Sequence, residues 1–129
     1  MSYYVEKTLG IPFEEAITKV TEALKAEGFG VLTEIDVQAT LKKKLDVDFR
    51  RYQILGACNP QFAYKALQAE RMVGAMLPCN VIVQEAEGGG TQVAAIDPIA
   101  SMQAIDNPQL AEIATIIRDK LRHVVEGLK

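Results

Sequence analysis

Apolar residues at spacings of three and four predict two long amphipathic helices. Phe13, Ile17, Val20 and Leu24 form the first stripe, and Gly28 ends it. The second stripe follows Pro108 and continues almost to the end of the chain; its members are Leu110, Ile113, Ala114, Ile117, Leu121, Val124, Val125 and Leu128. Each stripe leaves the charged residues on the other side of its helix, so each helix is expected to cover one face of a shared core.

Five segments rich in apolar and β-branched residues predict β-strands. They are residues 3–8, 29–36, 49–58, 79–85 and 91–96. In the second of them, strict alternation places Phe29, Val31, Thr33 and Ile35 on one face. The last two strands are joined by three consecutive glycines at 88–90, which favours a hairpin because glycine tolerates positive φ angles.

Three helix starts, including that of the last long helix, are marked by a capping residue followed by proline. They are Asn59-Pro60, Asp97-Pro98 and Asn107-Pro108. We expect Asn59 to open a helix that runs to about residue 71, followed by a connection over 72–78. Asp36 is expected to cap a short helix after the second strand.

This order predicts one α+β domain over residues 1–129, folded as a two-layer sandwich. Its sheet would be five-stranded and largely antiparallel or mixed, with the helices on one face. The first four strands match the split β-α-β-β-α-β arrangement. Because no other segment would cover the outer face, we expect a homodimer formed through that face or through a strand edge.

Composition narrows the possible partners and the cellular location. The 129 residues are 49% hydrophobic and 24% charged, with a formal net charge of −3. This balance disfavours nucleic acid as a partner, and no apolar run is long enough for a membrane span. The N-terminus lacks the pattern of a secretory signal, and two cysteines in a chain with an adequate core do not indicate a disulfide framework. A cytoplasmic protein with reduced thiols is expected.

Charge is distributed unevenly along the chain. Five basic residues crowd positions 42–51, whereas residues 72–115 contain no lysine or arginine. One interpretation is a solvated connection next to an acidic surface. The other is a basic rim for an anionic small ligand or a protein partner.

The residues capable of chemistry are few. Motifs for dinucleotides, phosphates, zinc proteases and paired thiols are absent, and nothing indicates a metal or a cofactor. The single histidine, His123, lies at the edge of the last helix stripe and is expected on the surface. Cys58 and Cys79 would lie about 20 Å apart if their strands ran parallel, unless residues 72–78 carried the chain back. Three alternatives remain open for the two cysteines. Both are buried and inert, one of them is a reactive thiol, or the two form a joint site.

The best candidate site is the turn at Cys58, Asn59 and Pro60, where a helix N-terminus presents backbone N–H groups. With Asp36 and Cys79 it would form a cleft for a small molecule, an anion among the candidates. A non-enzymatic binding or interaction module is the favoured function. A redox-responsive protein or weak nucleophilic enzyme that uses Cys58 or Cys79 is the alternative.

Three separated segments carry a resemblance to a known family. They are Gly28-Phe29-Gly30-Val31-Leu32-Thr33-Glu34-Ile35-Asp36, Ile54-Leu55-Gly56-Ala57-Cys58-Asn59-Pro60 and Leu77-Pro78-Cys79-Asn80-Val81. They resemble a widespread prokaryotic family known as domain of unknown function 302. The resemblance implies a compact α+β domain that pairs as a dimer, and it implies no reaction, substrate or cofactor.

Overall fold

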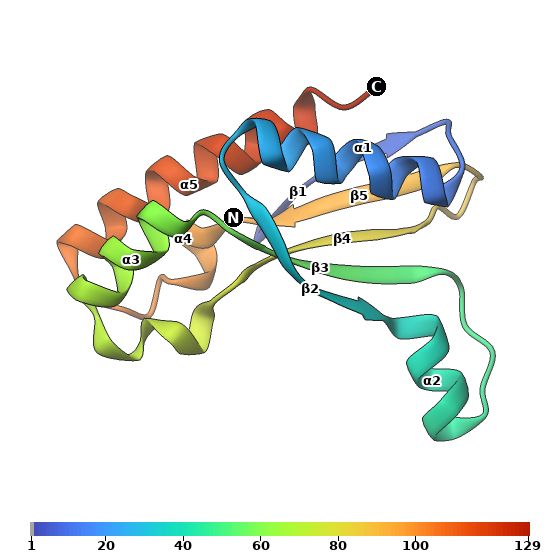
Figure 1. Ribbon diagram of the computed structural model, residues 1–129, viewed down its shortest axis with the longest axis horizontal. Helices are drawn as coiled ribbons and strands as arrows, with labels where there is room; N and C mark the ends of the chain where they lie inside the picture. The colour runs from blue at the N-terminus through green and yellow to red at the C-terminus, as the bar shows by residue number, and fades with distance from the viewer. Residues whose placement is uncertain (1) are drawn as a thin grey trace.

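The computed structural model describes residues 2–129 as a five-stranded sheet with helices packed against one face (Figure 1). The elements in chain order are β1 (Tyr4–Leu9), α1 (Phe13–Ala26), β2 (Gly30–Asp36), α2 (Val37–Leu45), β3 (Tyr52–Cys58), α3 (Pro60–Ala69), the 3₁₀ helix η1 (Arg71–Met76), β4 (Cys79–Glu85), β5 (Thr91–Ile96), α4 (Pro98–Ser101) and α5 (Pro108–Glu126). The predicted α+β class and the order of elements are confirmed.

The strands lie in the order β1-β5-β4-β3-β2, and every neighbouring pair is antiparallel. β1 and β2, which α1 connects, therefore occupy opposite edges of the sheet. The split β-α-β-β-α-β arrangement was a wrong prediction, because β5, β4 and β3 all lie between β1 and β2. The spacing of apolar residues identifies elements but does not determine which strands become neighbours.

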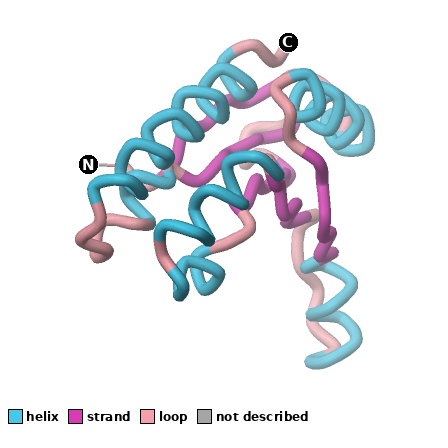
Figure 2. Tube along the Cα trace, turned by 60° about the vertical axis from the view of Figure 1, so that its left-hand side comes forward, coloured by secondary structure: helices cyan, strands magenta, loops and turns pink. Residues whose placement is uncertain are grey.

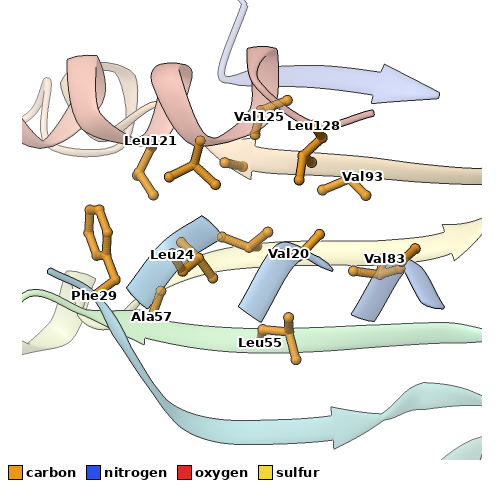
Figure 3. Close-up of a cluster of buried hydrophobic side chains, with 14 of the residues drawn as sticks. Val20, Leu24, Phe29, Leu55, Ala57, Val83, Val93, Leu121, Val125 and Leu128 are labelled. Carbon is orange, nitrogen blue, oxygen red and sulfur yellow. The ribbon is translucent and has the colours of Figure 1, made fainter. Parts of the chain in front are cut away.

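The core lies between the sheet and the layer formed by α1 and α5, which run side by side (Figures 1 and 2). Val20 and Leu24 of α1 and Leu121 of α5 are fully buried, as the predicted stripes required. They meet the inward residues of the strands, including Leu55 and Val83 (Figure 3). The two amphipathic helices thus bury their apolar sides against one face of the sheet.

Helix α2 stands apart from this core (Figure 2). It follows Asp36, whose carboxylate accepts a 2.9 Å hydrogen bond from the backbone N–H of Ala39, so the predicted cap is confirmed. None of its residues is buried, and it contacts β2, β3 and the segment 46–51 that leads into β3. The lysines of the basic cluster lie on this projecting helix.

The alternation predicted for β2 reverses at a β-bulge. Val31 pairs with Ala57 on the inner face, but Thr33 pairs with Gly56 on the outer face, so Leu32 is the extra residue. The prediction that Val31 and Thr33 share one face is therefore wrong. Leu32 is left 67% exposed at the end of the sheet.

Candidate functional site

Both cysteines lie at the same end of the sheet. β3 and β4 are antiparallel neighbours, and Ala57, next to Cys58, pairs with Cys79. The expected parallel arrangement, with the cysteines about 20 Å apart, is wrong. α3 and η1 bring the chain back to the same end of the sheet at which β3 finishes, so β4 runs antiparallel to β3. Residues 72–78 provide this return.

A cavity of about 270 Å³ lies between this end of the sheet and the helices α3, α4 and α5. Ala63 and Ala66 come from α3, and Ala114 and Ile117 come from α5. Small side chains on two facing helices leave this space, because an alanine extends only one carbon beyond the backbone. The bulged Leu32 also contributes to the wall.

The lining is almost entirely apolar. Cys58, Cys79 and Asn59 supply its thiols and its amide, and no lysine, arginine, histidine, aspartate or glutamate is among the lining residues. The site lacks a charged group that could move a proton or balance a ligand's charge.

Asn59 occupies the N-cap position of α3, but its side chain makes no capping hydrogen bond. Its Nδ2 instead donates to the backbone carbonyl of Glu27 over 3.3 Å. Gly28, whose φ is +87°, turns the chain beside Asn59, and a Cβ there would lie 3.2 Å from Nδ2. Asn59 therefore ties the turn before β2 to the start of α3, and Pro60 takes the predicted first helical position.

Burial raises the pKa of Cys79 to about 11, and the neighbouring thiol of Cys58 adds to this effect. A thiolate in an apolar cavity loses its hydration without gaining a cationic partner. Cys79 is therefore held as a protonated, weakly nucleophilic thiol at neutral pH.

We expect iodoacetamide to modify Cys79 at pH 7 roughly 100-fold more slowly in the folded protein than in the unfolded chain, since each pKa unit lowers the thiolate fraction tenfold. Mass spectrometry of the Cys79 peptide from the unsubstituted chain measures this rate separately from that of Cys58. The unfolded chain loses the Cys79 proton first as pH rises, so the free energy of unfolding should fall from about pH 9 towards pH 11. The Cys79→Ala variant should lack this contribution. Rapid modification of folded Cys79 at neutral pH would contradict its assignment as an inert thiol.

The other predicted site features lie elsewhere. Asp36 pairs with Gln53 at the opposite end of β2, about 20 Å along the strand from the Gly30–Cys58 pair, so its placement in the cleft was wrong. The basic cluster is also at that opposite end and cannot form a rim for the cavity. His123 is on the surface as predicted, with Nδ1 3.2 Å from a carboxylate oxygen of Glu27.

The described residues 2–129 contain no group of three or more His, Cys, Asp or Glu side chains arranged to hold a metal ion. Across the same residues, no helix is both long and apolar enough to cross a membrane.

Most residues that line the cavity were not predicted as site residues, and Ala114 and Leu32 are two examples. Ala114 belongs to the stripe of α5 and was identified there as a core residue. Ala114 is small and lies between the larger Leu110 and Ile117 along the stripe. That difference in size was the signal in the sequence for a gap in the packing. Leu32 gave no signal, because a bulge cannot be located from alternation alone.

An antiparallel sheet with helices packed on one face and an apolar cavity at one end defines a compact α+β domain. The sequence profile of the family described as Domain of unknown function DUF302 matches residues 5–128, and the chain belongs to this family. The predicted resemblance is confirmed.

Two individual proteins are similar to this chain, one in sequence and one in both sequence and structure. An uncharacterized protein of Aquifex aeolicus (strain VF5) is 30% identical over 94 residues, which cover 73% of this chain and 59% of that protein. The crystal structure of an uncharacterized conserved protein DUF302 from Bacillus stearothermophilus superposes with a TM-score of 0.92. It is 31% identical in sequence, and the match covers 100% of both chains.

Proposed function

We propose that this chain is a non-enzymatic binding protein that takes a small, uncharged, largely apolar molecule into the cavity between α3, α5 and the end of the sheet. The observation that carries the proposal is the almost entirely apolar lining of this cavity of about 270 Å³. Small-molecule sites in proteins are concave and mostly apolar, with a few polar groups that orient the ligand. A space of this size is therefore a feature that a ligand can use.

The volume sets the size of the ligand. An apolar cavity of about 150 Å³ admits a single benzene ring. The larger cavity in this protein suits one or two fused rings, or a branched alkyl chain of similar bulk. Asn59 and the two thiols can orient a single polar group at the wall.

The residues that line the cavity argue against an anionic ligand, which was one of the candidates predicted from the sequence. Pro60 at the first position of α3 has no N–H, and the lining contains no basic side chain. An anion that entered this cavity would lose hydration without gaining a cation. The apolar wall favours an uncharged molecule.

Indole is a suitable test ligand because its two fused rings match the cavity. At about ten times its Kd, a ligand of the folded state stabilises it by about 1.4 kcal/mol. For a domain of this size, that corresponds to a rise in Tm of roughly 4 °C. We expect this rise with indole and none with inorganic phosphate, and we expect amide chemical-shift changes at Ala63, Ala66 and Ala114.

The Ala63→Phe variant fills the cavity and should remove both effects of indole. The control is Ala111→Phe, which places the same ring on an exposed position of α5 and should leave binding intact. An unchanged response of Ala63→Phe, or stabilisation by phosphate alone, would rule out the proposed site.

A thiol-dependent function is the second candidate, and the shared position of Cys58 and Cys79 favours it. The raised pKa of Cys79 opposes it. Rapid iodoacetamide modification of Cys58 in the folded Cys79→Ala variant would support this candidate over simple ligand binding.

A further inference from the structure

Of the described residues that line the cavity, Asn59 alone carries a side-chain amide, and only one end of that amide is engaged. Nδ2 donates to the Glu27 carbonyl over 3.3 Å. A carbonyl can only accept, so the amide nitrogen must face Glu27 and Oδ1 must point away from it. Across residues 2–129, no group donates a hydrogen bond to this oxygen. The acceptor end of the amide is therefore free.

The other Asn-Pro-Gln segment of the chain shows that local sequence does not cause this vacancy. Asn107 precedes proline and glutamine just as Asn59 does, and its Nδ2 also donates to a backbone carbonyl, that of Ala69, over 2.8 Å. Its Oδ1 nevertheless accepts from the backbone N–H groups of Gln109 and Leu110 over 3.1 and 3.3 Å. An asparagine in this context can thus satisfy both ends of its amide, whereas Asn59 satisfies one.

The free oxygen of Asn59 is accessible. Among the described residues, no buried side-chain nitrogen or oxygen lacks a hydrogen-bond partner, so this Oδ1 is open to the cavity or to solvent. An asparagine at the start of a helix normally uses its oxygen for the first backbone N–H groups. A ligand that donates a hydrogen bond would give the oxygen the partner that α3 does not supply.

The polar groups around Asn59 favour a ligand that brings a donor. Among the side chains of the wall, the strong donor, Asn59 Nδ2, is already engaged, whereas the strong acceptor, Oδ1, is free. Pro60 has no N–H, and Gln61, which carries the next backbone N–H of α3, is exposed and lies outside the cavity lining. The thiols of Cys58 and Cys79 are weak donors and weak acceptors. The wall therefore matches a ligand with an N–H or O–H group.

We propose that Asn59 Oδ1 accepts a hydrogen bond from the ligand, so that the cavity selects apolar ring compounds with a single N–H or O–H group. This inference rests on the proposed function, because it assigns the polar contact within the same cavity. It narrows the ligand class to molecules such as indoles and alkyl-substituted phenols. A site built to hydrogen-bond a ligand group rejects analogues that lack the group, because the acceptor of the site would stay unpaired.

Three bicyclic probes of nearly the same shape test the inference on the unsubstituted chain. Indole has an N–H donor, indene has a CH₂ group in its place, and benzofuran has an oxygen that can only accept. We expect the Kd from amide chemical-shift titration to be roughly 5- to 10-fold lower for indole than for either of the other probes. An apolar cavity without an acceptor would give the opposite order for indole and indene, because indole would lose the hydrogen bond of its N–H to water.

Asn59→Ala should remove the preference for the donor. The Kd of indole should rise roughly 5- to 10-fold, whereas the Kd of indene should change by no more than about twofold. The matched control is Asn107→Ala, which deletes the same side chain where Oδ1 is used by the helix. That variant should lose stability and keep the ratio of the three Kd values. Amide spectra establish whether each variant is folded, and the comparison of probes on the unsubstituted chain depends on neither variant.

The outcomes separate this inference from the proposed function. Equal Kd values for indole and indene, or tighter binding of indene, would overturn the role of Asn59 and leave an apolar site without a polar contact. A preference for indole that persists in Asn59→Ala would assign the hydrogen bond to another group and would also overturn this role. Failure of all three probes to bind would remove the proposed function, and this inference with it.

Discussion

Leu24→Ala should lower the free energy of unfolding by about 2–5 kcal/mol. Leu24 is completely buried, and it lies where α1 meets the sheet and α5 (Figure 3). The truncation removes apolar contacts and leaves a cavity that the surrounding elements cannot close. Urea denaturation monitored by circular dichroism measures the loss.

Leu45→Ala provides the matched comparison. Leu45 is also a helical leucine, but it ends α2 and is 66% exposed. We expect a change within about 0.5 kcal/mol, since exposed substitutions away from special features have small effects. Equal losses for the two variants would contradict the assignment of the core to the layer between α1, α5 and the sheet.

Gly56→Ala is expected to destabilise the protein by about 1–3 kcal/mol. A Cβ at Gly56 would overlap Thr33 Oγ1 and lie 2.7 Å from Pro78 Cγ. The β3 backbone is therefore tightly confined between β2 and the residue that precedes β4. Thermal and urea unfolding of the purified variant measure the decrease in its free energy of unfolding.

The control for this prediction is Gly30→Ala in the adjacent strand, where an added Cβ meets no atom within 4 Å. That change should be neutral or stabilising by about 0.4–1 kcal/mol, because alanine restricts the unfolded chain. Combining Gly56→Ala with Thr33→Ala should recover part of the loss, since the overlapping hydroxyl is then gone. Full additivity of the two substitutions would show that Thr33 does not cause the strain.

Local signals in the sequence predicted most of the elements. The segments Cys79–Glu85 and Thr91–Ile96 form strands with the predicted limits. Asp97 and Asn107 cap their helices through their side chains, as expected. Such features depend on neighbouring residues only, and for this reason a single sequence reveals them.

Features that depend on distant contacts were harder to predict. Asn59 has the same cap-then-proline context as Asn107, yet its amide is held by the Glu27 carbonyl from another part of the chain. The bulge at Leu32 reversed the faces of β2, and the return of the chain through η1 placed Cys58 beside the partner of Cys79. The candidate site therefore combined Cys58, Asn59 and Cys79, which line the cavity, with two residues that do not. Pro60 occupies the first turn of α3, and Asp36 lies at the far end of the sheet.

The position of β1 has a consequence for how the chain acquires its structure. Val5 pairs with Ala95, although α1 leads from β1 directly to the opposite edge of the sheet. Closing such a distant contact carries a large entropic cost, and topologies of this kind fold slowly. During synthesis β1 has no hydrogen-bonding partner until β5 has left the ribosome, so β1 joins the sheet only after the other four strands have been made.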